Sequence, residues 1–114
     1  MYKLTTKDRS YLLRIHDSIE RIIDNSSPFE NSKDFFNDAQ AFDASMMNFV
    51  IIGEMVAKLS EEFTASTQHI VDWHKIKGFR NIIAHNYFGI DAEEVWQIIH
   101  TKLATLDRDI QTFI

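Results

Sequence analysis

The sequence predicts an all-α protein: an up-and-down antiparallel bundle of four to five helices in a single domain that spans residues 1–114. A chain of 114 residues has the size of one ordinary domain. Hydrophobic residues make up 45% of it and include nine Phe, which is enough apolar material for one core. Only three Gly and one Pro interrupt the chain, and this favours long helices with short connections.

The first helix is expected to begin near Thr5, with Asp8 at the spacing of a capping box. It should end at residues 25–28, where Pro28 closes a polar stretch. A short helical turn is expected within residues 31–38. The apolar residues of the first helix recur at helical spacing: Leu12, Ile15, Ile19, Ile22 and Ile23.

The second long helix is expected over residues 38–60, and its second half is apolar almost all round. Such a helix is normally central, or is shared between the core and a partner. Gly53 and Glu54 interrupt the apolar run. Glycine is unfavourable inside a helix, so Gly53 indicates a close approach of another helix. Residues 61–71 read as a loop.

A third helix should begin at the N-cap Asp72 and run towards Asn86, and a turn is expected over residues 86–90. The last helix should start at Asp91, with Glu94 completing a capping box. We expect it to be one continuous helix, with an apolar stripe made of Val95, Ile99, Leu103, Leu106, Ile110 and Phe113.

Composition excludes several classes of function. The chain has no Cys, which rules out disulfides and thiolate metal sites and is compatible with the cytoplasm, the location we expect. No signal peptide or membrane-spanning run is seen, so no membrane association is expected. The net charge of −5 argues against a large nonspecific nucleic-acid surface, so RNA chemistry would need a local basic spot, a partner or symmetric doubling of a small patch.

The most informative stretch is residues 73–91, which places Arg80, Asn81, His85 and Tyr87 in the order R-N-x-x-x-H-x-Y. An imidazole can act as general acid or base near neutral pH. A guanidinium can hold a phosphate and stabilise the charge that develops during phosphoryl transfer. Together with an Asn that bonds the phosphate or orients the His, they suit metal-free RNA cleavage by the ribose 2′-hydroxyl.

Helix geometry constrains this reading. Asn81 and His85 lie on one face, whereas Arg80 and His85 point roughly 140° apart. Two routes could unite them. The helix could fray before His85, or a two-fold axis could bring two copies of the motif into one cleft. We favour the second route because it also supplies two His, one as base and one as acid.

Arg-x4-His-x-Tyr at a helix end resembles the signature of the HepT-like branch of the HEPN proteins. Three further segments resemble the family in the right order: Phe49-Val50-Ile51-Ile52-Gly53-Glu54, Trp73-His74-Lys75-Ile76 followed by Gly78-Phe79-Arg80-Asn81, and Tyr87-Phe88-Gly89-Ile90-Asp91 followed by Val95-Trp96. A lone R-x4-H would be weak evidence, but this ordered set spans nearly the whole chain and is specific.

The resemblance implies a dimeric HEPN bundle that acts as the toxin of a type VII HEPN/MNT toxin–antitoxin system. Arg80 and His85, with Asn81 in support, would line a cleft between protomers and cleave RNA, either tRNA or mRNA, without a metal or other cofactor. The partner would be a minimal nucleotidyltransferase antitoxin, which would neutralise the toxin by transferring AMP to Tyr87.

Ordinary explanations stand beside each functional one. Arg80, Asn81 and His85 could form a plain exposed helix end, and Tyr87 could simply pack its ring. Glu54 either pairs with Arg80 or orients His85, or it points to solvent. The other histidines lack the spacing of metal ligands: His16, His69, His74 and His100.

Three functions therefore compete. The first is a metal-independent endoribonuclease. The second is a non-catalytic interaction module that binds a nucleotidyltransferase and is modified by it at Tyr87. The third is a purely structural helical dimer. Retention of a motif does not guarantee catalysis.

Overall fold

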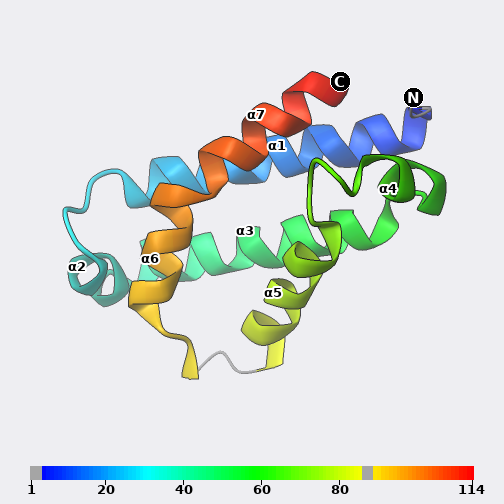
Figure 1. Cartoon of the computed structure of the whole chain (residues 1–114). Coiled ribbons are helices and arrows are strands. Elements are labelled where there is room, and N and C mark those ends of the chain that lie inside the picture. The colour runs from blue at the N-terminus through cyan, green and yellow to red at the C-terminus, as the bar shows by residue number, and fades with distance from the viewer. Residues whose placement is uncertain (1–3, 86–88) are drawn as a thin grey trace.

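The computed structural model describes residues 4–85, without the side chain of His85, and residues 89–114, and it contains only helices there. The predicted all-α class is confirmed. Seven helices are present in the described residues where four to five were expected: α1 (Thr6–Ser26), α2 (Ser32–Asn37), α3 (Ala39–Lys58), α4 (Glu61–Thr67), α5 (Trp73–His85), α6 (Ala92–Thr101) and α7 (Leu103–Phe113) (Figure 1).

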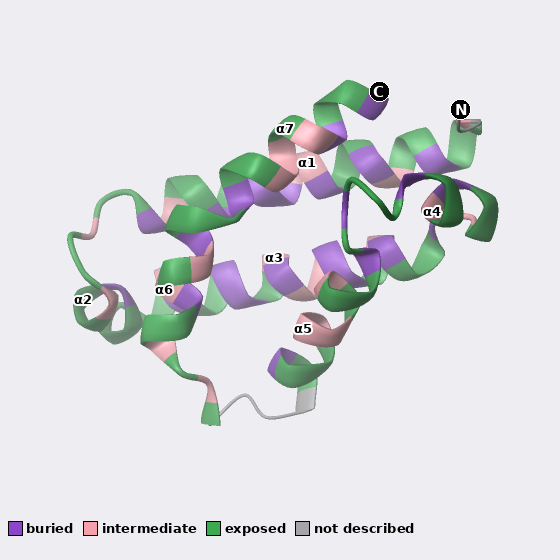
Figure 2. Ribbon diagram, in the orientation of Figure 1, coloured by how far each residue is buried: buried purple, intermediate pink, exposed green. Residues whose placement is uncertain are grey.

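The long helices α1 and α3 form an antiparallel pair at the centre of the molecule (Figure 1). Helix α7 returns along α1, while α5 packs on α3. The faces of these helices that point inward carry the buried residues (Figure 2). The predicted stripe of α1 supplies four fully buried side chains, and α3 adds the others that meet it: Leu12, Ile15, Ile19, Ile22, Met46, Phe49, Ile52 and Val56.

Helix α3 is central, as its apolar sequence predicts, but it is not covered on every side. Met47 is 60% exposed, and Val50 and Ile51 are only partly buried. The apolar surface of α3 therefore exceeds what the described part of one chain covers.

The start of α1 agrees with the prediction at its N-cap and differs at the capping box. Thr5 accepts a hydrogen bond from the backbone N–H of Asp8 (3.0 Å). The buried carboxylate of Asp8 binds Ser60 at the start of α4 rather than closing the box. It accepts the backbone N–H of Ser60 at 2.8 Å and the Ser60 hydroxyl at 2.6 Å. This contact ties the N-termini of α1 and α4 together.

The predicted loop at residues 61–71 is wrong, because it contains α4. Ser60 caps this helix by accepting the N–H of Phe63 (3.2 Å). Phe63 and Thr67 are fully buried, and the Thr67 hydroxyl accepts the indole N–H of Trp73 at 2.9 Å. The helix is too short to show a periodic pattern, and its buried polar residue made it resemble a loop.

The last helix begins as predicted but does not run unbroken. Asp91 caps α6 by accepting the N–H groups of Glu93 and Glu94. The chain then breaks at Lys102, between α6 and α7. The side chains of His100 and Thr101 bond the carbonyls one turn back, at 2.8 and 2.6 Å, and such back-bonding bends helices. The predicted apolar stripe nevertheless faces the core across both helices.

No helix in the described ranges is both long enough and apolar enough to cross a bilayer.

Candidate active site

Helix α5 carries the motif residues and is anchored firmly at its start. The carboxylate of Asp72 caps it by accepting the N–H of Lys75 at 3.0 Å. Trp73, only 5% exposed, anchors the first turn in the core. The helix continues through His85, so the first of the two routes, a helix that frays before His85, is not found.

Arg80 lies directly on Gly53 of α3. A Cβ atom added to Gly53 would lie 2.1 Å from Cβ and 2.3 Å from Cγ of Arg80, far inside any real contact. Phe49 and Phe79 pack edge to face beside this contact, with ring centroids 5.2 Å apart. The close helix approach predicted from Gly53 is confirmed. Because Gly53 has no side chain, the aliphatic stem of Arg80 has room to pack against it.

The guanidinium of Arg80 donates from Nη1 to Oε1 of Glu54. The Arg80 side chain is 17% exposed and that of Glu54 is 50% exposed. Of the alternatives for Glu54, pairing with Arg80 is therefore what the structure shows, although half of the Glu54 side chain still faces solvent. Gly53 contacts the aliphatic stem of Arg80, and the adjacent Glu54 binds its guanidinium.

The Nε–H of Arg80 is buried and has no hydrogen-bond partner among the described residues. A buried donor without a partner costs about 1–3 kcal/mol. Arg80 is thus held in place by its ion pair, while its buried Nε–H stays unsatisfied within the described residues.

The structure describes the other predicted site residues only in part. Asn81 is exposed on α5, directly after Arg80. The side chain of His85 and the whole of Tyr87 lie outside the described residues. The structure therefore brings together Arg80, Gly53 and Glu54. Within the described part of the chain, no group of three or more His, Asp or Glu side chains is placed to hold a metal ion.

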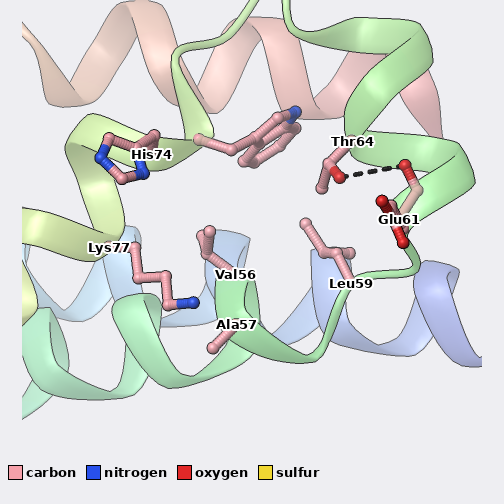
Figure 3. Close-up of a pocket in the computed structure, with 8 residues that line it drawn as sticks. Val56, Ala57, Leu59, Glu61, Thr64, His74 and Lys77 are labelled. Carbon is pink, nitrogen blue, oxygen red and sulfur yellow. Dashed lines mark hydrogen bonds between the residues drawn. The ribbon is translucent and has the colours of Figure 1, made fainter.

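Sequence reasoning missed two residues near the site, His74 and Lys77. Both line a cavity of about 220 Å³ at the start of α5 (Figure 3). His74 was considered only as a metal ligand, and Lys77 was not considered. The signal available in the sequence was the absence of any Asp or Glu from α5.

Comparison with known proteins identifies the family of the chain. The family model described as Ribonuclease HepT-like matches residues 15–113. A protein of Caldanaerobacter subterraneus subsp. tengcongensis named "Putative RNase TTE0752" is 28% identical over 106 residues, which cover 93% of each chain. The protein of Methanocaldococcus jannaschii named "Putative RNase MJ0127" is 30% identical over 108 residues, which cover 93% of this chain and 86% of that one.

A longer relative also matches. The protein of Methanocaldococcus jannaschii named "Gamma-glutamylcyclotransferase and putative RNase MJ0434" is 31% identical over 100 residues, and the match covers 88% of this chain but only 44% of that protein. No solved structure shows significant similarity. Since the family model covers most of the chain and the ordered motifs agree with it, this chain belongs to the HepT-like ribonuclease family.

Proposed function

We propose that this protein is a metal-independent endoribonuclease that uses Arg80, Asn81 and His85. The ribose 2′-oxygen attacks the adjacent phosphorus and forms a P–O2′ bond, while the P–O5′ bond breaks. A base removes the 2′-hydroxyl proton, and an acid protonates the departing 5′-oxygen, so that the products are a 2′,3′-cyclic phosphate and a 5′-hydroxyl. The observation that carries the proposal is the fixed, incompletely bonded guanidinium of Arg80 on the helix that bears His85.

Arg80 stabilises the negative charge that builds on the phosphate in the transition state. Such stabilisation is strongest when the donor is already in place, because no reorganisation is then needed. Gly53 and Glu54 supply this preorganisation, so Glu54 acts as a positioning residue. Asn81, exposed beside Arg80, supports the phosphate or orients His85.

The cleft is completed by a second copy of the chain. One His as base and another as acid would complete the proton transfers, and a two-fold axis near α5 supplies both. The incompletely covered apolar side of α3, with Met47 60% exposed, is consistent with a homodimer.

In the cell, the protein would be the toxin of a type VII HEPN/MNT toxin–antitoxin system in the cytoplasm. Its antitoxin would be a minimal nucleotidyltransferase that transfers AMP to Tyr87. In that transfer, the Tyr87 hydroxyl oxygen attacks the α-phosphate of ATP and pyrophosphate leaves. The bulky, charged AMP group, two residues after His85, would then exclude RNA from the cleft.

The first test is RNA cleavage by the purified, unmodified protein in excess EDTA, with His85→Ala prepared in the same way. Cleavage by the wild type and none by His85→Ala is the expected result. Equal cleavage by both proteins would show that the activity lies elsewhere. Absence of cleavage across tRNA and mRNA substrates would reject the nuclease.

A second candidate function is favoured by the net charge of −5, which is unusual for a protein that binds free RNA. Here the bundle is a non-catalytic module that binds the nucleotidyltransferase and accepts AMP at Tyr87. AMP transfer to the wild type but not to Tyr87→Phe, with no RNA cleavage by the unmodified protein, would favour this function.

A further inference from the structure

A second site with polar walls lies at the start of α5, the helix that carries the proposed catalytic residues, in the cavity where α3, α4 and α5 meet (Figure 3). The cavity has a volume of about 220 Å³. This is smaller than the roughly 300–1,000 Å³ of sites for drug-sized ligands, so it suits one ring system. Three helices and the junction between α3 and α4 line it, and the residues that matter below are Val56, Leu59, Glu61, Trp73, His74 and Lys77.

The walls of this cavity differ in chemistry. His74 and Lys77 stand on the α5 side, whereas Glu61 and Thr64 stand on the α4 side (Figure 3). The floor between them is apolar and is made by the buried residues Val56, Leu59 and Trp73. A ligand that fits is flat and apolar on its faces, anionic at one end and rich in N–H donors at the other.

Helix α5 connects this cavity with the catalytic residues. His74, Lys77 and Asn81 are spaced i, i+3 and i+7, so they share one exposed face of the helix. From Lys77 to position 85 the helix rises about 12 Å. A strand lying along α5 crosses that distance in more than one nucleotide step, so a nucleotide to one side of the scissile phosphate reaches the cavity.

The charge of α5 also differs from that of the rest of the molecule. Lys75, Lys77 and Arg80 are its cations, and it contains no Asp or Glu. The remaining chain has nine cations against seventeen acids and therefore a net charge of −8. Helix α5 is the local basic element that RNA binding by an acidic protein requires.

We infer that the cavity is an RNA subsite for a nucleotide that flanks the scissile phosphate. The flanking phosphate binds Lys77, with His74 beside it. The base lies over the apolar floor, and the carboxylate of Glu61 accepts a hydrogen bond from its exocyclic amino group. Carboxylates read the cytosine N4 amino group in this way. The subsite therefore favours cytosine over uracil. This inference rests on the proposed ribonuclease function.

Binding to a non-cleavable ligand tests the subsite separately from catalysis. The probe is a fluorescent single-stranded 2′-O-methyl oligocytidine, measured by anisotropy. Lys77→Ala should weaken binding about fivefold to tenfold and reduce the slope of log K against log salt by about 0.7, the value for one phosphate contact on a single strand.

The matched control is Lys33→Ala, which removes the same charge from an exposed residue of α2, outside α5. It should change binding less than twofold. Equal weakening by both variants, no effect of either, or no binding of the probe to the wild type would each overturn the subsite.

The role of Glu61 has its own readout. Wild type should bind oligocytidine more tightly than oligouridine, and Glu61→Ala should remove most of that preference. An unchanged preference would overturn the base contact.

Cleavage in EDTA by the wild type, with KM unchanged in Lys77→Ala, would reject the subsite and leave the ribonuclease standing. Loss of wild-type cleavage, with the binding pattern intact, would reject the ribonuclease alone.

Discussion

Arg80 lies in two environments, one apolar and one charged. Its aliphatic stem is packed against the backbone of Gly53, and its charged head meets Glu54 near solvent. Long cations commonly cover apolar surface with their stems in this way. Here the stem is held so closely that position 53 must be glycine.

Gly53→Ala is therefore expected to destabilise the fold by about 1–3 kcal/mol, because a Cβ at 2.1 Å from the Cβ of Arg80 forces α3 and α5 apart. The measurement is chemical denaturation. Gly78→Ala is the matched control, since a Cβ there meets nothing within 4 Å. It should raise stability by about 0.5–1 kcal/mol through helix propensity. Equal losses in both variants would contradict this account.

Glu54→Gln should change catalysis much more than stability. Half-exposed ion pairs contribute only about 0–1 kcal/mol, so the free energy of unfolding should hardly move. Release of the guanidinium should lower kcat at least about tenfold, because misplacement of a catalytic group by about 1 Å can cost 100-fold. Steady-state kinetics check this. An unchanged kcat would show that Glu54 does not position Arg80.

Sequence reasoning was effective at the residue scale where one residue leaves a distinctive pattern. Gly53 inside an apolar helix predicted a close approach, and Glu54 on the same surface raised the pairing with Arg80 that is observed. His74 and Lys77 left no such pattern. They line a cavity together with residues of α4. Because residues 61–71 were predicted to be a loop, that cavity could not be foreseen.

At the scale of elements, the N-caps of the helices could be predicted from the sequence, whereas the break between α6 and α7 could not. Thr5, Asp72 and Asp91 each accept the backbone N–H bonds expected of an N-cap. The break between α6 and α7 involves no Pro or Gly, and it coincides with the side-chain bonds of His100 and Thr101. Tertiary packing decides whether the side chain of such a residue bonds the carbonyl one turn back or points to solvent. The spacing of apolar residues in the sequence carries no information about that choice.

The Asp8–Ser60 contact joins two helix starts and gives a prediction at this scale. Asp8→Ala should cost about 1–3 kcal/mol, because it leaves the N–H of Ser60 without its partner. Ser60→Ala removes both the hydroxyl bond and the cap of α4. The double variant should lose less than the sum of the two single losses, as measured by denaturation.

Asp24→Ala, on the exposed end of α1, is the control and should change stability by less than about 0.5 kcal/mol. Full additivity of the Asp8 and Ser60 effects would show that the contact is not energetically coupled.

At the scale of the whole molecule, α7 packs on α1. The start of α1 and the end of α7 lie at the same end of the molecule (Figure 1). His16 joins them, with its Nδ1 atom 2.6 Å from Asp107 of α7 and its Nε2 atom 2.7 Å from Glu20. The hydrogen bond to Asp107 raises the pKa of His16 above 6.5, with smaller contributions from Glu20 and Asp17 against desolvation.

Because the folded pKa is the higher one, the protonated His16 stabilises the fold fully below about pH 6.5, and this contribution fades as pH rises through the folded pKa. The stability difference between wild type and His16→Gln should therefore be full below about pH 6.5 and shrink as pH rises through the folded pKa of His16. Denaturation at several pH values checks this. Gln68→Ala, an exposed control without a titratable side chain, should differ from wild type by the same amount throughout.

The proposed dimer also predicts behaviour of the whole assembly. His85→Ala should be inactive alone. If the cleft uses one His85 from each copy, a mixed dimer of wild type and His85→Ala keeps only one of them and should also be inactive. After wild type is unfolded and refolded together with excess His85→Ala, cleavage per wild-type chain should therefore fall well below that of wild type alone. Cleavage that stays proportional to the amount of wild type would contradict a composite cleft.

The absence of acids from α5 has a kinetic consequence. A polyanion approaching the molecule meets repulsion from a body of net charge −8 and attraction along this one helix. The field should therefore turn the strand during its approach, so that most productive encounters begin already aligned with α5. Added salt would then slow association more than it speeds dissociation, and an overall acidic protein would capture RNA in a single orientation.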